Sequence, residues 1–311
     1  MSHVLVTGAD GVLGRLLVSR LRQQGDRVTT VALGPELALG ETELSLDLSR
    51  PDHLEALAGS GFRCDTVIHL AGRIDIQLAT GATPDAPPVP RTALVPALYQ
   101  QNVLATANVA NFCLQSGVRH LVFASSQSVY GMPVERPLSE QSPCRPLEHY
   151  AASKLCAEQL LEVASRQGLA VTVLRCAGVF AEHRRQGVVR TFVRQALADH
   201  RIEVNAAYPL PLDVIHVDDV TSAFILAASV PAVGFRCLNV STGEPCSLDL
   251  LADAVAALVP GCVVAHLGVP QPVVQLDNSA ARLSLGWQPA PLPQRLHAMI
   301  AAVRDEAAAH A

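Results

Sequence analysis

The chain has 311 residues, which fits one large domain or two coupled ones. Half of its residues are hydrophobic and 16% are charged, so a disordered or charge-rich extended protein is excluded. The formal net charge of −5 leaves no excess of basic residues to hold a phosphate backbone, which excludes nucleic acid as a partner.

No apolar stretch reaches the roughly 18 residues that cross a bilayer. Met1-Ser2-His3 leads directly into an apolar run without a basic leader. We therefore expect a cytoplasmic protein without a membrane partner. The eight cysteines never occur as C-x-x-C, so we expect neither a metal site nor a disulfide framework.

Short apolar runs alternate with helix-length amphipathic stretches, which is typical of βαβ units around a mostly parallel sheet. The strands are continuously apolar, so both faces of the sheet should be covered. We expect strands at 3–7, 27–33, 64–70, 119–124 and 171–176, and helices at 12–24, 51–58, 97–116 and 148–167. The pattern predicts an α/β fold with a Rossmann-type doubly wound parallel sheet.

After about residue 177 the alternation becomes less regular. This part predicts a helix near 187–199, strands near 213–217 and 235–241, and helices near 218–229, 247–258 and 292–308. We expect a dinucleotide-binding domain over 1–176 and a smaller C-terminal α/β substrate lobe over 177–311, with the chain crossing back near 213–241. Two proline-rich segments, 80–96 and 131–147, are predicted to be surface loops.

A glycine-rich turn joins the first predicted strand to the first predicted helix. Gly8 permits the tight turn, Gly11 lets a pyrophosphate approach the backbone, and Gly14 lets helix and strand pack closely. The free N–H groups at the helix start, around Val12 and Leu13, would face the phosphates. The turn therefore predicts a dinucleotide site.

The end of the second strand normally separates the two nicotinamide cofactors. An acid there binds the ribose 2′-hydroxyl, and an arginine accepts the 2′-phosphate of NADP. The stretch Val31-Ala32-Leu33-Gly34-Pro35 contains neither. NAD is favoured because a positive charge for the additional phosphate is missing, while use of NADP stays open.

Tyr150 and Lys154 are spaced i and i+4, so they share one face of a helix. A free phenol titrates near 10, and a neighbouring ammonium favours the phenolate. Ser126, just past the fourth strand, could hold the substrate oxygen while Tyr150 passes the proton and a hydride moves to or from the cofactor. These three residues are the predicted catalytic set.

These motifs resemble the extended branch of the short-chain dehydrogenase/reductase superfamily, which includes NAD-dependent sugar epimerases and dehydratases. The resemblance covers nearly the whole chain. Beyond the glycine turn and the Ser-Tyr-Lys set, it is carried by Asp47-Leu48, His69-Leu70-Ala71-Gly72, Asn102-Val103, Val129-Tyr130-Gly131, His216-Val217-Asp218-Asp219-Val220, Asn239-Val240-Ser241-Thr242-Gly243-Glu244 and Leu285-Gly286-Trp287-Gln288-Pro289.

The resemblance implies further cofactor contacts on the loops that follow the strands. Tyr150 and Lys154 also contact the cofactor in this reading, and Asn102 orders the site, although a helix N-cap role for Asn102 stays open. A homodimer formed through helices 97–116 and 148–167 is implied as well. The remaining implied contacts are Asp47 and Leu48 at the adenine, Leu70, Ala71 and Gly72 along the cofactor, and Val179 at the nicotinamide amide.

The departures from the family pattern concern the substrate. Members that act on nucleotide sugars tend to carry an arginine in the slot that Leu212 occupies here, and 268–276 contains no arginine ahead of Asp277. The asparagine expected after the fifth strand is Gly178. A diphosphate needs bidentate cations, so we expect a small, polyhydroxylated and possibly anionic substrate instead. Gln127 and Ser128 replace the Asp-Glu pair of the dehydratases, which excludes dehydration.

The sequence therefore predicts an NAD(P)-dependent oxidoreductase that transfers hydride to or from a secondary alcohol or ketone. Its candidate substrate-binding residues are Arg73, Gln127 and Arg184. One alternative is a nucleotide-sugar epimerase that binds its substrate through Arg184 or Arg190. A second alternative is a binding protein that senses the cofactor without chemistry.

Overall fold

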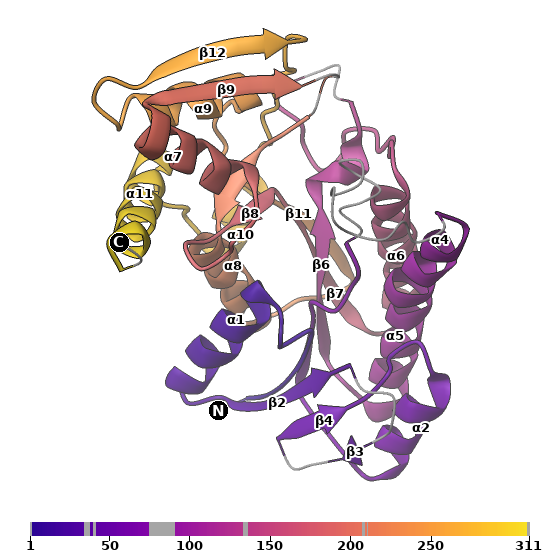
Figure 1. Cartoon of the computed structure of the whole chain (residues 1–311). Coiled ribbons are helices and arrows are strands. Elements are labelled where there is room, and N and C mark those ends of the chain that lie inside the picture. Colours follow the sequence, from indigo (N-terminus) through magenta and orange to yellow (C-terminus); the bar gives the residue numbers. More distant parts are fainter. Residues whose placement is uncertain are drawn as a thin grey trace. The chain divides into compact units, whose positions relative to one another are not determined.

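The computed structural model describes residues 2–33, 38–39, 42–74, 91–132, 136–206, 209 and 211–309. The chain forms two compact units, each made of separate chain segments (Figure 1). The first unit comprises Met1–Met132, Pro143–Arg175 and Thr221–Leu238, and the second comprises Pro133–Ser142, Cys176–Val220 and Asn239–Ala311. The assignment of cofactor binding to one part and substrate binding to the other stays a prediction.

Within the described part of the chain, the largest sheet has eight strands and is mostly parallel, and most of its residues belong to the first unit. β1 pairs in parallel with both β2 and β5, whereas β3 pairs with β4 in the antiparallel direction. All residues of β5 and β7 are buried, as expected for strands covered on both faces. In sheet order the strands are β11 (Phe235–Val240), β7 (Ala170–Cys176), β6 (His120–Ser126), β5 (Thr66–His69), β1 (His3–Thr7), β2 (Arg27–Ala32), β4 (Glu43–Ser45) and β3 (Ala38–Leu39).

The helices of the first unit cover this sheet. α5 and α6 lie side by side (Figure 1), and Phe112 of α5 and Leu161 of α6 pack with Val67 and Leu121 of the sheet. The described helices are α1 (Val12–Gln23), α2 (Pro51–Gly59), α4 (Arg91–Tyr99), the π-helical turn η1 (Gln100–Leu104), α5 (Ala105–Ser116), the 3₁₀ turn η2 (Gln127–Tyr130), α6 (His149–Ser165) and α8 (Val217–Ser229), which begins in the second unit. The Rossmann-type parallel fold predicted from the sequence is confirmed.

The prediction of a loop over 80–96 is wrong for residues 91–96. These residues form part of α4, with Pro96 inside the helix. A proline removes one helical hydrogen bond, but Leu98, two residues further on, is completely buried and helps to hold the helix against the core. Residues 80–90 lie outside the described part of the chain.

The second unit contains two small parallel sheets, β8 with β10 and β9 with β12. β9 and β12 run side by side, and α7 and α9 pack against them (Figure 1). Phe192, Ile202, Leu251 and Ile300 belong to its core. The bounds are β8 (Gly178–Phe180), α7 (Val188–Asp199), β9 (Arg201–Ala206), β10 (Val214–His216), α9 (Leu248–Ala256), β12 (Val263–Gly268), α10 (Ser279–Leu285) and α11 (Leu292–Ala309).

A buried polar cluster joins the start of α8 to α11 within the second unit. Asp219 accepts two hydrogen bonds from Arg295, at 2.9 and 2.6 Å, and one from the backbone of Ala290. The indole of Trp287 donates to the Asp219 carbonyl. Asp219 and Trp287, which belong to the family pattern, therefore stabilise the second unit. Across the described helices, none combines the length and the apolarity that a bilayer span requires.

Candidate active site

The three glycines of the first turn have three different surroundings. Gly8 has a φ of +69°, and a Cβ there would lie 2.7 Å from the backbone nitrogen of Ala71. A Cβ on Gly14 would lie 2.2 Å from the Gly8 carbonyl oxygen, so α1 packs against the turn at a distance that only glycine allows. A Cβ on Gly11 would meet one atom at an ordinary 3.4 Å. The backbone at Gly11 is thus open to a ligand.

A cleft of about 540 Å³ opens beside this turn in the first unit. Its apolar wall comes from the ends of β2 and β4, and its floor comes from the loop after β5. The start of α1 faces the turn without a side-chain cap or an acidic residue in its first turn, so its backbone N–H groups point out of the helix end. The lining residues are Gly8, Asp10, Gly11, Val31, Leu33, Leu46, Leu48, Leu70, Ala71, Gly72, Arg73 and Gln101.

Most of the predicted cofactor residues of the first unit meet at this cleft. Val12, Leu13 and Gly14 form the first turn of α1, next to Gly11. Asp47 does not line the cleft, and its carboxylate accepts hydrogen bonds from the backbone N–H and the hydroxyl of Ser49, at 2.9 and 2.7 Å. The Asp47 side chain is thus held in a local turn, while Leu48 lines the cleft.

Asn102 lies in the π-helical turn η1, so the open alternative of a helix N-cap is wrong. Helical structure already begins at Arg91, and the π turn places the Asn102 side chain inside the protein. Its amide accepts from the backbone N–H of Arg73 at 2.6 Å and donates to the Arg73 carbonyl at 3.0 Å. It also donates to Ser153 Oγ at 2.9 Å. Asn102 therefore joins the loop after β5 to α6.

Ser126, Tyr150 and Lys154 all lie in the first unit, at the end of β6 and in the first two turns of α6. Lys154 is 4% exposed, and its Nζ donates to the carbonyl of Ala124 at 2.9 Å. The same Nζ lies 6.0 Å from the centre of the Tyr150 ring. Ser126 Oγ accepts from the backbone N–H and the hydroxyl of Ser128, at 3.2 and 2.9 Å. Its own O–H can therefore donate to another group.

A buried ion pair behind this set was missed in the sequence. Arg175 of β7 forms an ion pair with Glu158 of α6 at 2.7 Å, with side chains 8% and 3% exposed. Glu158 also accepts a hydrogen bond from Ser125, and Arg175 donates to the hydroxyl of Tyr130 at 3.0 Å. Glu158 stands four residues after Lys154 on the same helix, so the sequence does show that the two side chains share one helix face. The pair ties the middle of α6 to the ends of β6 and β7.

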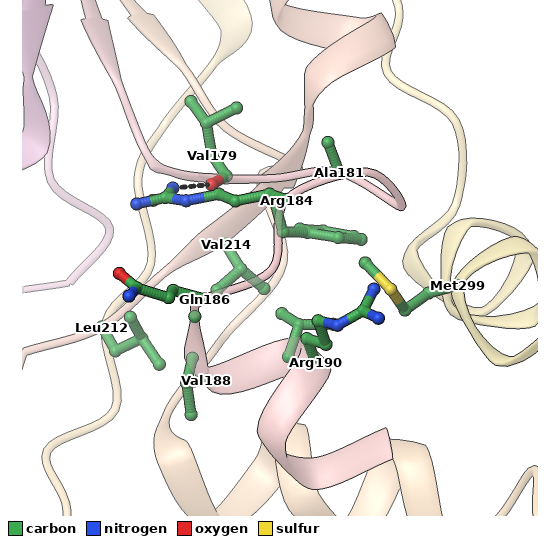
Figure 2. A pocket seen from close by; sticks show the side chains of 13 residues that line it. Val179, Ala181, Arg184, Gln186, Val188, Arg190, Leu212, Val214 and Met299 are labelled. Carbon is green, nitrogen blue, oxygen red and sulfur yellow. Dashed lines mark hydrogen bonds between the residues drawn. The ribbon is translucent and has the colours of Figure 1, made fainter. Parts of the chain in front are cut away.

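The second unit holds Val179 and Arg184, at a cavity of about 150 Å³ (Figure 2). Arg184 Nη1 donates to the Val179 carbonyl at 2.8 Å, as the dashed line in Figure 2 shows. Arg190 donates to the Glu182 carbonyl and forms an ion pair with Glu306. Apolar side chains, among them Leu212 and Met299, provide much of the remaining lining.

Gln127 and Arg73 complete the predicted site residues. Gln127 begins the 3₁₀ turn directly after Ser126, and the Arg73 side chain is exposed at the rim of the cleft in the first unit. Among the described residues, no three His, Cys, Asp or Glu side chains are arranged to hold a metal ion.

Comparison with known proteins identifies the class. The model of the NAD dependent epimerase/dehydratase family matches residues 4–240. The chain belongs to this family, whose members depend on NAD, and the predicted resemblance is thereby confirmed.

Its similarity to particular proteins extends over almost the whole chain. A UDP-glucose 4-epimerase of Mycolicibacterium smegmatis is 31% identical over 305 residues, which cover 92% of this chain and 93% of that protein. A 2-alkyl-3-oxoalkanoate reductase of Shewanella oneidensis is 27% identical over 276 residues, 83% of this chain and 66% of that protein. The solved structure of MoeE5 in complex with UDP-glucuronic acid and NAD has a TM-score of 0.77 and 30% identity, covering 98% of this chain and 99% of that one.

The cleft of the first unit fits the nicotinamide dinucleotide on which the family depends. The open backbone at Gly11 and the uncapped start of α1 suit a diphosphate, because helix N-termini attract anions. Val31, Leu46 and Leu48 offer an apolar wall for an adenine. The prediction of NAD as the cofactor is confirmed at the level of the family.

Proposed function

We propose that this protein transfers a hydride between NAD and a secondary alcohol or ketone, with Ser126, Tyr150 and Lys154 as its catalytic set. The observation that carries this proposal is the position of the Lys154 ammonium. It is buried, held by the Ala124 carbonyl and placed one helical turn from the phenol of Tyr150. A cation fixed there favours the phenolate form of Tyr150.

In this mechanism, each catalytic side chain has one task. The nicotinamide, when bound, supplies or accepts the hydride. The Ser126 hydroxyl donates a hydrogen bond to the substrate oxygen. Tyr150 takes the proton from the substrate alcohol or returns it to the carbonyl. The positive charge of Lys154 favours the phenolate form of Tyr150, which can accept that proton.

We further propose that the cleft residues bind the cofactor. The glycine turn and the start of α1 would hold the diphosphate, and the apolar wall would hold the adenine. Asn102 would act by fixing the Arg73 backbone beside them. Val179 lies in the second unit, so its contact with the nicotinamide amide is supported by the family resemblance alone. The proposed cofactor contacts are Gly8, Gly11, Val12, Leu13, Gly14, Asp47, Leu48, Leu70, Ala71, Gly72, Asn102, Tyr150, Lys154 and Val179.

For the substrate, we favour a small polyhydroxylated molecule that carries an anionic group. Leu212 and Gly178 stand where nucleotide-sugar enzymes of this family tend to have polar contacts, and both line the cavity of the second unit. Arg190 is already neutralised by Glu306. Arg184 would bind the anionic group, and Arg73 and Gln127 would contact the substrate nearer to Ser126.

A nucleotide-sugar epimerase is the second candidate function, and the comparisons favour it. The M. smegmatis relative is a UDP-glucose 4-epimerase, and MoeE5 was solved with UDP-glucuronic acid and with UDP-glucose. In this alternative Arg184 would contact a phosphate or a sugar carboxylate. The 2-alkyl-3-oxoalkanoate reductase among the relatives gives a precedent for a substrate of another class.

The catalytic proposal is tested by Tyr150→Phe, which removes the proton-transferring hydroxyl and keeps the ring. We expect turnover of any accepted alcohol to fall at least about a hundredfold, the usual contribution of a general acid or base. The NAD dissociation constant should stay within about twofold. Tyr99→Phe is the matched control, since the Tyr99 hydroxyl makes an exposed contact of 3.4 Å with His149 Nδ1.

Retention of activity by Tyr150→Phe would refute the mechanism. A wild-type protein that binds NAD and exchanges hydride with no alcohol in a broad panel would support the cofactor-sensing alternative.

The substrate class is tested by thermal shift with NAD present, comparing sugar acids and polyols with UDP-sugars. We expect sugar acids to raise the melting temperature and Arg184→Gln to abolish that shift, because the variant removes the cation that binds the acid. Arg194→Gln, on an exposed position of α7, is the matched control. A shift produced by UDP-sugars and by no simple sugar would overturn the preference and favour the epimerase.

We also propose a homodimer in the cytoplasm. Leu104 of η1 and Val163 of α6 are 44% and 53% exposed, on the helices through which the resemblance implies dimer formation. All eight cysteines are free thiols, which supports a reducing compartment.

A further inference from the structure

A continuous chain of hydrogen bonds runs through the interior of the first unit and passes through the imidazole of His69, at the end of β5. His69 Nδ1 lies 2.7 Å from Thr7 Oγ1, and His69 Nε2 lies 3.0 Å from Thr106 Oγ1. The Thr7 oxygen accepts from the backbone N–H of Ala71 at 3.3 Å, and the Thr106 hydroxyl donates to the Asn102 carbonyl at 2.6 Å. Thr7, His69 and Thr106 are at most 1% exposed, so these polar atoms depend on one another.

The backbone carbonyl of Asn102 fixes the direction of the hydrogen bonds that pass through a neutral His69 ring. The single hydroxyl hydrogen of Thr106 is used by the Asn102 carbonyl, so the Thr106 oxygen accepts from His69 Nε2–H. A neutral imidazole with a proton on Nε2 has a lone pair on Nδ1, which accepts the hydroxyl hydrogen of Thr7. The Thr7 oxygen then accepts the Ala71 N–H. This direction of the hydrogen bonds requires the neutral tautomer of His69 that carries its proton on Nε2.

The surroundings of His69 also oppose a positive charge on the ring. Complete burial, and after it the nearby Lys154 ammonium, lower the pKa of His69 from 6.5 to about 3. The imidazole stacks on Phe123 with ring centres 5.6 Å apart, and Lys154 Nζ lies 4.8 Å from the centre of the same phenyl ring. A second cation beside Lys154 would be unfavourable.

The chain connects the wall of the cleft to the helix that carries Tyr150. At one end, Ala71 belongs to the cleft lining and approaches Gly8 more closely than any Cβ would allow. At the other end, the Asn102 side chain donates to Ser153 Oγ, and Ser153 donates to the Tyr150 carbonyl at 2.7 Å. The ends of β1 and β5, the π turn η1 and the helices α5 and α6 are thereby joined by one chain of hydrogen bonds.

We propose that His69 is a positioning residue, which acts as a neutral Nε2–H linker to hold the 70–73 loop and the π turn at Asn102 in register with Tyr150. This inference rests on the proposed function, because it gives His69 a part in the geometry of that site. His69 touches neither substrate nor cofactor in this assignment. Its effect passes through Ala71 at one end and through Asn102 at the other.

The tautomer is tested first, by ¹⁵N NMR of the imidazole nitrogens in the wild-type protein, with the His69 signals assigned by their loss in His69→Phe. We expect Nε2 to be protonated and Nδ1 unprotonated, with no titration between pH 8 and pH 5. A proton on Nδ1, or a titration near the ordinary histidine pKa, would overturn the assignment. The measurement does not depend on catalysis.

The positioning role is tested with threonine variants that keep the side-chain volume. Thr106→Val and Thr7→Val each remove two hydrogen bonds of this chain, and each should weaken NAD binding and lower kcat by roughly five- to tenfold. Thr106→Ser and Thr7→Ser retain the hydroxyl and should restore both quantities to within about twofold of wild type.

The first unit also provides a matched control. Thr172 Oγ1 lies 2.9 Å from His120 Nε2, both residues are buried, and burial lowers the pKa of His120 to about 4. Thr172→Val therefore removes a similar buried histidine contact away from the cleft. It should lower the melting temperature and leave the NAD dissociation constant and kcat unchanged.

If Thr106→Val and Thr172→Val lose only thermal stability, His69 has a merely structural role and the inference is wrong. If the valine variants weaken NAD binding while Tyr150→Phe remains active, the positioning role of His69 is supported and the catalytic proposal is wrong. The two ideas are therefore separable, because NAD affinity and the tautomer are measured without substrate.

Discussion

Glu158 and Arg175 illustrate how much depends on single residues behind the candidate site. Their charges are removed from water, and each is compensated by the other and by neutral partners in Ser125 and Tyr130. Such a pair stabilises a fold only as a complete unit, since removing one member leaves a buried charge without its counterion. The pair is therefore more sensitive to a single substitution than its net contribution to stability suggests.

We expect Arg175→Met to lower the free energy of unfolding by about 3–5 kcal/mol, because Glu158 remains buried without its counterion. The double variant Arg175→Met with Glu158→Leu should recover most of this loss. Urea unfolding at pH 7 measures both. The control is Arg166→Met, whose partner Glu162 is 46% exposed, and the expected change there is below about 1 kcal/mol. An equal loss in the control would contradict the role of burial.

At the scale of elements, the strands and helices of the first unit could be predicted because their signals are local. Continuous apolar runs marked β1, β5 and β7, and helical periodicity marked α1 and α6. The π turn at Asn102 could not be predicted, because the partners of Asn102 come from the loop after β5 and from α6. The i, i+4 spacing places Glu158 on the helix face of Lys154, but its ion pair with Arg175 and the contacts of His69 depend on partners from other elements.

The second unit was harder to predict because its elements are short. β8 has three residues and α10 has seven, and neither is long enough to establish a period. β9 alternates exposed and buried residues over Arg201–Asn205, a pattern that the sequence does contain and that was missed. β12 is largely exposed and has no continuous buried run that would mark a strand. It forms a strand because it pairs with β9.

The packing of α1 on the glycine turn leads to a prediction at the same scale. Gly14→Ala should destabilise the protein and abolish NAD binding, because the added methyl group would lie against the Gly8 carbonyl and force α1 away from the turn. Gly59→Ala is the matched control, since Gly59 ends α2 and a Cβ there meets nothing within 4 Å. That variant should gain up to about 1 kcal/mol from helix propensity.

Thermal unfolding and NAD titration distinguish these two glycine variants. Wild-type NAD affinity in Gly14→Ala would show that α1 can shift without disturbing the cleft.

At the scale of the whole molecule, the proposed homodimer makes a further prediction. Val163→Glu places a charge on an exposed apolar position of α6 and should convert the dimer to a monomer, because a desolvated carboxylate is unfavourable in an interface. Sedimentation velocity measures the change. Val233→Glu, at a position 94% exposed outside α5 and α6, is the control. A wild-type protein that sediments as a monomer would contradict the dimer.

The chain enters the first unit three times and the second unit three times, so no single cut separates them. The first unit is incomplete until residues 221–238 have been synthesised, long after its glycine turn has left the ribosome. Exchanging either unit with that of a relative would require several splice points rather than one. Evolution of a new substrate preference in this chain must therefore proceed mainly by substitution within it, since shuffling one contiguous piece would damage both halves.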